Sequence, residues 1–170
     1  MFLQTDPDMA RIIARSVGLT LRDQIGPEYR PHQLLDLGCG IGSITAELKK
    51  FFPNTKVYGL DHQPQNIQLA AHSSPDCMFM VGDINSLPFQ DKSVDVVFTG
   101  NIYDYMYIPS DPTNTTTIFQ GLYLPRVLSE IHRVLTPGGL YYPFADPIIL
   151  KLSETKAAGF TPEGRYILRK

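Results

Sequence analysis

Apolar residues along the chain fall into two patterns: short continuous runs, and longer stretches in which they recur every three or four positions. The short runs predict β-strands and the longer stretches predict helices. Predicted strands cover residues 34–37, 57–60, 77–81, 94–99, 140–145 and 165–169. Predicted helices cover residues 5–29, 64–72 and 147–158, the segment between Ile44 and Pro53, and a stripe from Leu124 to Leu135. This alternation predicts a doubly wound, mostly parallel α/β sheet.

Prolines and glycines mark the ends of several predicted elements. Pro64 suits a first helical position because an N–H there would have no helical partner, and Pro125 is placed in a first turn for the same reason. Residues 137–139 would stop that helix, and Pro143 weakens the strand that contains it. The polar stretch 110–117 is predicted to belong to one long loop after the fourth strand.

Composition narrows the classes of protein to consider. The 170 residues suffice for one domain, and 43% apolar with 19% charged residues argue against disorder. A net charge of −2 lacks the basic excess of a dedicated nucleic-acid binder, so no nucleic-acid partner is expected. Two cysteines and four histidines share no ligand spacing, so no metal is expected. No apolar run reaches the roughly 20 residues that cross a bilayer, so we expect no membrane partner and a cytoplasmic protein.

Three glycines directly follow the first predicted strand. Gly38, Gly40 and Gly42 let the chain turn sharply and let a ligand approach the backbone without meeting a Cβ. A helix begins there, so free N–H groups point into the crevice beyond the strand ends. The pattern is G-x-G-x-G, because Ser43 stands where a dinucleotide-binding loop has its third glycine. A tight strand–helix turn without a ligand is the alternative.

Three aspartates lie at or near the ends of the first three strands. Asp36 lies beside the glycines, where a carboxylate would repel a pyrophosphate but suit an ammonium group. Asp61 can accept hydrogen bonds from a ribose diol, and Asp83 could bind an exocyclic adenine amine. The implied ligand has a cationic amino end, a ribose and an adenine, with no need for a phosphate. This argues against a nicotinamide-dependent oxidoreductase.

The segments that carry these residues resemble the class I S-adenosylmethionine-dependent methyltransferases, with a methyltransferase type 11-like domain. The matching segments are LLDLGCGIGSITAEL, VYGLDHQPQNIQLA, MFMVGDINSLPF, SVDVVFTGNIYDY and VLSEIHRVLTPGGLYY. They occur in the family's order and spacing from about residue 33 to 145. The resemblance implies a Rossmann-like methyltransferase fold, S-adenosylmethionine as the cofactor, and methyl transfer as the activity.

The resemblance also implies which residues hold this methyl donor. They are Asp36, Gly38, Cys39, Gly40, Gly42, Asp61, His62, Asp83, Ile84 and Asn101. The glycines, Asp36 and the small Cys39 would surround the methionine end, and Asp61 would hold the ribose hydroxyls. His62 would pack on the adenine ring, whose edge would meet Asp83 and the backbone N–H of Ile84. Asn101 would face the methionine carboxylate or the reacting centre.

Each assignment has a purely structural alternative. Asp36 could tie down the loop, Asp61 and Asp83 could cap strand ends, and His62 could be an ordinary surface histidine. The thiol of Cys39, like that of Cys77, is read as structural, because a reactive thiol needs an electropositive site.

The resemblance implies no universal catalytic residue. Methyl transfer from a sulfonium mainly requires alignment and exclusion of water, and a base is needed only if the nucleophile loses a proton during attack. The segment TGNIYDY lacks the NPPY-like sequence of enzymes that methylate nucleobase amines or glutamine amides. The candidates to face a small-molecule acceptor are Tyr103, Asp104, Tyr105 and Tyr107, with Asp146 on the same side of the sheet. Alternatively, the tyrosines only cover the sheet end.

One domain is predicted over residues 1–170. It consists of an N-terminal helical segment (1–30), a donor-binding core (33–145) and an abbreviated C-terminal helix and strand (146–170). Members of the family usually end in two antiparallel strands, whereas this sequence predicts one. We therefore expect a shortened C-terminal strand region and a six-stranded or otherwise incomplete sheet. Its unpaired edge could recruit a second chain, so a homodimer is a hypothesis.

Two functions follow from these observations. The first is methyl transfer from S-adenosylmethionine to a small-molecule acceptor. The second is a catalytically silent relative that binds the donor or a partner, because the abbreviated end and the short lid would preclude turnover.

Overall fold

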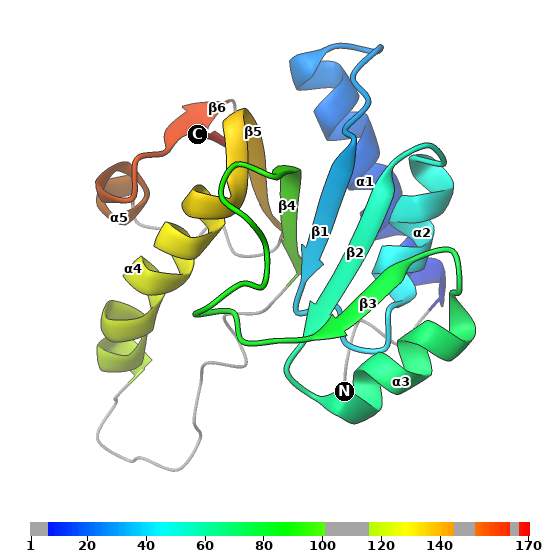
Figure 1. The fold of residues 1–170 in the computed structure, drawn as a ribbon. Coiled ribbons are helices and arrows are strands. Elements are labelled where there is room, and N and C mark those ends of the chain that lie inside the picture. Colours follow the sequence, from blue (N-terminus) through cyan, green and yellow to red (C-terminus); the bar gives the residue numbers. More distant parts are fainter. Residues whose placement is uncertain (1–6, 101–115, 145–151, 164–166) are drawn as a thin grey trace.

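The alternation of strands and helices forms one sheet of seven strands in the order β3-β2-β1-β4-β5-β7-β6. A computed structural model describes residues 7–100, 116–144, 152–163 and 167–170. The strands are β1 (Gln33–Leu37), β2 (Lys56–Asp61), β3 (Met78–Val81), β4 (Val94–Gly100), β5 (Leu135–Phe144), β6 (Thr161–Glu163) and β7 (Ile167–Arg169). The helices are α1 (Pro7–Ile25), α2 (Ser43–Phe51), α3 (Pro64–Ser73), α4 (Thr116–Val134) and α5 (Leu152–Ala157). Helices α1, α2 and α3 cover one face of the sheet, and α4 packs on the other (Figure 1).

The first five strands are parallel to one another, and β7 is antiparallel to both of its neighbours. The chain moves outward from β1 to β3 and then returns to β4 on the other side of β1. Strand order therefore reverses between β1 and β4. Ligands of doubly wound sheets bind at such a point, beyond the carboxyl ends of the strands. The predicted doubly wound, mostly parallel sheet is confirmed.

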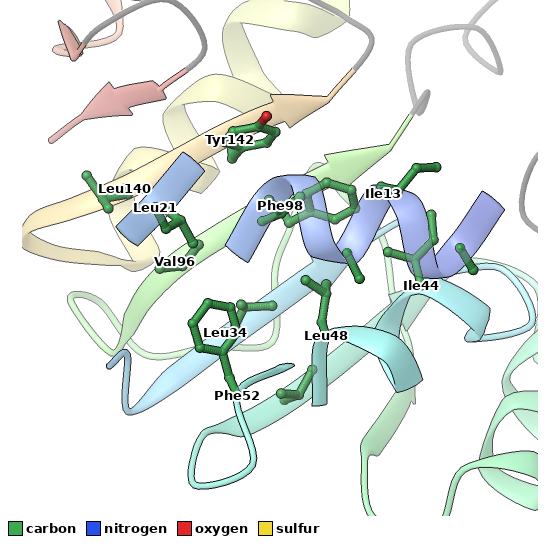
Figure 2. Close-up of a cluster of buried hydrophobic side chains, with 14 of the residues drawn as sticks. Ile13, Leu21, Leu34, Ile44, Leu48, Phe52, Val96, Phe98, Leu140 and Tyr142 are labelled. Atoms are coloured by element: carbon green, nitrogen blue, oxygen red, sulfur yellow. The ribbon is translucent and has the colours of Figure 1, made fainter. Parts of the chain in front are cut away.

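Two apolar clusters fill the space between the sheet and its helices, one on each face. Side chains alternate along β1, so Leu34 packs with α1 and α2 while Leu35 packs with α4. Figure 2 shows the first cluster, in which Leu34 and Val96 lie with Leu48 of α2. The central strands are thus buried on both faces, as their continuous apolar runs predict. Asp36 shares the face of Leu34, which places its carboxyl group under α2.

The expected six-stranded sheet is wrong, because the C-terminal region contributes two short strands. Strand β7 lies within the predicted strand 165–169 and pairs with β5, and β6 pairs with β7 through Pro162 and Leu168. Three residues that include a proline carry no readable periodicity, although proline is tolerated on an edge strand such as β6. Both antiparallel strands expected of the family are present, so an incomplete sheet no longer supports a homodimer.

Helix α4 begins earlier than predicted. Thr116 and Thr117 belong to this helix and not to a loop, and Pro125 lies inside it. The low helix propensity of threonine and the missing N–H of proline favoured a shorter helix. Strand β5 also begins earlier, at Leu135, and it contains residues 137–139, beside which its register with β4 shifts.

Arg133 of α4 anchors the loop between β3 and β4. Its guanidinium donates to the carbonyls of Leu87 and Phe89 at 3.0 and 2.9 Å. It also pairs with Asp91 at 2.7 Å and with Glu130 at 2.8 Å. Glu130 in turn accepts the Leu87 N–H at 2.8 Å, and the hydrogen bond from Arg133 lowers the pKa of Glu130. These contacts fix the path of the chain beyond β3.

Two kinds of feature are absent from the described residues. None of their helices combines the length and the apolar character needed to cross a membrane. No three of their His, Cys, Asp or Glu side chains gather in a way that could hold a metal ion.

Candidate functional site

The glycine loop, residues 38–42, turns over the carboxyl end of β2, the neighbour of β1. The φ angles of Gly38, Gly40 and Gly42 are +80°, +54° and +81°, in the left-handed region that favours glycine. The N–H groups of Gly38 and Cys39 both donate to the Leu60 carbonyl, at 2.8 and 3.0 Å. The Gly42 N–H donates to the Cys39 carbonyl at 3.0 Å, and α2 begins at the next residue. The loop thus lies at the point where strand order reverses.

Asp61, the last residue of β2, joins three segments through one carboxylate. Its Oδ2 accepts the Gly40 N–H at 3.0 Å. Its Oδ1 accepts the Gln63 N–H at 2.8 Å and the side-chain amide of Asn66 at 3.3 Å. The residue is only 7% exposed. An ionised carboxylate has about four acceptor positions, so Asp61 fulfils the structural role of a strand-end cap and can still accept a further donor.

His62 and Asp83 lie at the exposed rim of this region. His62 Nδ1 is 3.6 Å from Asp61 Oδ1, and its side chain is 72% exposed. Asp83 follows β3, and its Oδ1 accepts the N–H and the side-chain amide of Asn85 at 2.8 and 3.0 Å. The Gly82 N–H donates to the Asp61 carbonyl at 3.0 Å. The ends of β2 and β3 are therefore joined next to the glycine loop.

Asn85 carries a polar atom without a partner. Its Oδ1 is buried and accepts no hydrogen bond from any described residue. A buried acceptor left in this state costs about 1–3 kcal/mol. Ile84 packs against the apolar cluster on the α4 face, so the backbone between Asp83 and Asn85 is held in place. A ligand that carries an amine could supply the missing donor.

Asp36 is buried under α2, with 2% exposure. The Thr45 hydroxyl donates to its Oδ2 at 2.5 Å. Burial raises the pKa of the Asp36 carboxyl from 3.8 to about 7, a rise that the Thr45 hydrogen bond opposes and the Asp61 carboxylate adds to. The group is therefore partly protonated at neutral pH, and a cation placed beside it would favour its ionised form.

Cys39 and Cys77 are buried and free. Burial above all, and then the carboxylates of Asp36 and Asp61, raise the pKa of the Cys39 thiol. Burial likewise raises the pKa of the Cys77 thiol to about 11. Both thiols stay protonated at neutral pH, and only a thiolate is a strong nucleophile. This supports the structural reading of both residues.

Gly42 is required by packing as well as by its backbone angle. It is buried, and a Cβ atom there would lie 2.8 Å from the Cβ of Ala70 and 2.8 Å from the ring of Phe79. The close approach of α3 and β3 to the loop is thus a reason for this glycine that needs no ligand.

The Gly42→Ala variant is expected to lose about 1–2 kcal/mol more unfolding free energy than Gly138→Ala. Gly138 is the matched control. Its φ of +77° gives the same backbone strain, but a Cβ atom added there would lie 3.8 Å from its nearest neighbour, a side-chain nitrogen of Arg169. Only Gly42→Ala adds overpacking, which the half-buried Phe79 relieves in part by shifting. Urea denaturation of both variants measures the difference. Equal losses would show that the close contacts of Gly42 with Ala70 and Phe79 add nothing to the cost of a Cβ atom there.

The structure brings most of the predicted donor-site residues to one edge of the sheet. Those at the carboxyl ends of β1, β2 and β3 are Asp36, Gly38, Cys39, Gly40, Gly42, Asp61, His62, Asp83 and Ile84. The predicted residues that lie outside the described part of the chain are Asn101, Tyr103, Asp104, Tyr105, Tyr107 and Asp146. Sequence reasoning missed Thr45, Asn66 and Asn85, which contact the three aspartates. A single threonine or asparagine in a sequence does not predict which residue it contacts, because its neighbours depend on the fold.

Comparison with known proteins places this chain in a family. Residues 35–142 match the methyltransferase domain family. The demethylmenaquinone methyltransferase of Chlorobaculum tepidum is 32% identical over 128 residues, covering 75% of this chain and 46% of that protein. The malonyl-[acyl-carrier protein] O-methyltransferase of Dechloromonas aromatica is 31% identical over 133 residues, covering 78% of this chain and 43% of that protein. The chain thus spans less than half the length of either relative.

A solved structure shares the fold. It is that of an amino pentose methyltransferase from Micromonospora echinaspora with S-adenosylmethionine bound. The TM-score is 0.62 at 21% identity, over 79% of this chain and 50% of that one. The family match covers well over half of the sequence, and the glycine loop lies at the switch point of a seven-stranded sheet. The chain therefore belongs to the class I S-adenosylmethionine-dependent methyltransferase family.

Proposed function

We propose that the protein binds S-adenosylmethionine at the carboxyl ends of β1, β2 and β3 and transfers its methyl group to a small-molecule acceptor. The observation that carries this proposal is the placement of the Asp61 carboxylate. It lies at the carboxyl end of β2, next to the glycine loop that follows β1, holds both that loop and the start of α3, and retains acceptor capacity for a ribose diol.

The chemistry of the lining fits a cationic adenosine derivative better than an anionic dinucleotide. A pyrophosphate at the glycine loop would face the carboxyl groups of Asp36 and Asp61, whereas the sulfonium and the ammonium of S-adenosylmethionine are positively charged. The Oδ1 of Asn85, which accepts no hydrogen bond from the part of the chain that the structure describes, adds an acceptor near Asp83, and the exocyclic amine of adenine is a matching donor. The carboxyl groups of Asp36 and Asp61 and the Oδ1 atom of Asn85 thus support a cationic adenosine derivative as the cofactor, which needs no phosphate-binding group.

Each residue in this proposal binds or positions the donor. Asp36 would hold the ammonium, Asp61 the ribose hydroxyls, and Asp83 the adenine amine, with His62 against the ring. The bound donor would supply a methyl group that is attached to a sulfonium. When that methyl group is transferred, the rest of the donor is a neutral thioether and therefore a good leaving group. The protein then has to align an acceptor with that methyl group and keep water away. No step in this scheme demands a nucleophilic side chain.

The relatives support a small-molecule acceptor. One relative is named for demethylmenaquinone and another for a malonyl group on an acyl-carrier protein, two chemically different acceptors. We keep Tyr103, Asp104 and Tyr105 as the proposed acceptor-side residues and Asn101 as a proposed donor-site residue, because all four follow β4 in the sequence.

Calorimetric titration with S-adenosylhomocysteine, the demethylated product, tests the donor half of the proposal. We expect one site per chain, competition by S-adenosylmethionine, and no binding of NAD. An absence of heat and of competition with both adenosyl ligands would overturn the proposed function.

Turnover is tested separately, by measuring release of S-adenosylhomocysteine with a panel of hydroquinones, carboxylic acids and amines. We expect release with at least one acceptor class. Donor binding without release on any acceptor would instead favour the catalytically silent relative.

A further inference from the structure

A groove of about 380 Å³ lies between α1 and α2, away from the glycine loop. Its lining residues are Arg11, Ala14, Arg15, Leu19, Arg22, Glu47, Lys50 and Phe51. They come from α1 and from the second half of α2, and none of them belongs to the proposed donor site. Ligand pockets typically measure about 300–1,000 Å³, so the groove has room for a small molecule or a headgroup.

Positive charge dominates this groove. Four of its lining side chains are cationic and one, Glu47, is anionic, although the whole chain has a net charge of −2. Lys50 pairs with Glu47 at 2.7 Å, and Arg11 pairs with Asp8 at 3.4 Å through largely exposed side chains. Arg15 and Arg22 form no ion pair with any residue that the structure describes. Two guanidinium groups therefore remain available to an anion.

Arg22 is held in position for such a contact. Its guanidinium carbon lies 4.5 Å from the centre of the Phe51 ring, a cation–π arrangement. Its Nε is buried and donates to no acceptor among the described residues. Phe51 can lie this close to α1 because residue 18 is glycine: a Cβ there would be 2.1 Å from the ring. Arg22 also lines the groove, so an anion bound there would face its guanidinium group.

We propose that this groove binds a phosphate group. The planar fork of an arginine matches the oxygens of a phosphate, and several cations around one groove suit a group with more than one negative oxygen. The apolar side chains of Ala14 and Phe51 in the lining exclude water on one side, which strengthens the charge contacts. The phosphate comes from a soluble phosphorylated molecule or from a lipid headgroup, which the exposed Leu19 at the rim, 44% accessible, could also contact.

Titration of the full chain with inorganic pyrophosphate, at constant ionic strength set with chloride, tests this proposal by calorimetry. We expect saturable binding that is at least ten-fold weaker in Arg15→Gln and in Arg22→Gln. Arg30→Gln is the matched control, because Arg30 is an exposed arginine outside the groove that donates to the carbonyls of Pro27 and Tyr29. If Arg22→Gln fails to fold, the exposed Arg15→Gln variant still decides the question.

Vesicles of phosphatidylglycerol, compared with vesicles of phosphatidylcholine, distinguish the two sources. Binding of pyrophosphate alone supports a soluble ligand, and selective binding to phosphatidylglycerol vesicles that Arg15→Gln abolishes supports a lipid. Binding of neither probe, or equal binding by the groove variants and wild type, would overturn the proposal. The readout needs no methyl donor, so its failure is distinguishable from a failure of the proposed function.

Discussion

Replacing Asp61 with alanine will weaken the binding of S-adenosylhomocysteine by about 1–3 kcal/mol, roughly five- to 150-fold. The proposed ribose contact loses its acceptor. The N–H groups of Gly40 and Gln63 also lose the carboxylate that holds the glycine loop against the start of α3. Both effects act on the same ligand, so calorimetry on the wild type and the variant measures their sum.

Asp95 offers a matched control at the opposite end of the sheet. Its Oδ2 accepts the N–H groups of His32 and Gln33 at 2.7 and 2.9 Å, so it too ties a loop to a strand with one carboxylate. Asp95→Ala should lower the unfolding free energy about as much as Asp61→Ala and leave the donor affinity unchanged. Wild-type affinity in Asp61→Ala would remove Asp61 from the donor site. Equal losses of affinity in both variants would mean that binding merely follows stability.

The parallel half of the fold could be predicted because its signals are local. The run from Val94 to Thr99 is nearly continuous in apolar residues, which fits a strand covered on both faces, and β4 spans Val94–Gly100. The repeated order of strand, turn and helix then predicts a parallel sheet, and the residues that follow parallel strands meet at one edge of the sheet. Asp61 and Asp83 could be placed together on this argument alone.

The parts that sequence reasoning missed depend on contacts between distant segments. Strand β6 has three residues, and it exists because β7 lies beside it, a pairing that no short pattern reveals. The start of α4 at Thr116 contradicts the local preference of threonine and of the proline that follows within the helix. Likewise, the buried acceptor of Asn85 can be recognised only when its surroundings are known.

Replacing Asp36 with asparagine is expected to stabilise the ligand-free protein above pH 7. Burial raises the pKa of Asp36 from 3.8 to about 7, so between these values the folded protein holds a proton that the unfolded chain has released. The stability that this proton provides is complete below about pH 4 and is lost as the pH rises through 7. The difference between the two pKa values corresponds to a loss of at most about 4 kcal/mol in the free energy of unfolding. Asparagine stays neutral, so its variant lacks this loss.

Urea denaturation from about pH 5.5 to 9 measures the effect. The stability advantage of Asp36→Asn over the wild type should grow with pH and level off above 7. Thr45→Val provides a check with the opposite sign, because it removes the hydroxyl that donates to the Asp36 carboxylate. The stability of Thr45→Val should continue to fall to a higher pH than that of the wild type, and by a larger total, because the hydrogen bond that lowers the pKa of Asp36 is lost. Parallel pH profiles for all three proteins would contradict the argument.

The same carboxyl group couples stability to donor binding. An ammonium beside Asp36 would favour the ionised form and lower its pKa, so donor binding near pH 6 should release a proton from the wild type and none from Asp36→Asn. Calorimetry in two buffers of different ionisation enthalpy measures this proton directly. The variant should therefore bind the donor more weakly while it folds more stably, because a charge that is costly to bury alone becomes favourable once a cation joins it. Equal proton release by both proteins would separate Asp36 from the donor and leave its effect on folding unchanged.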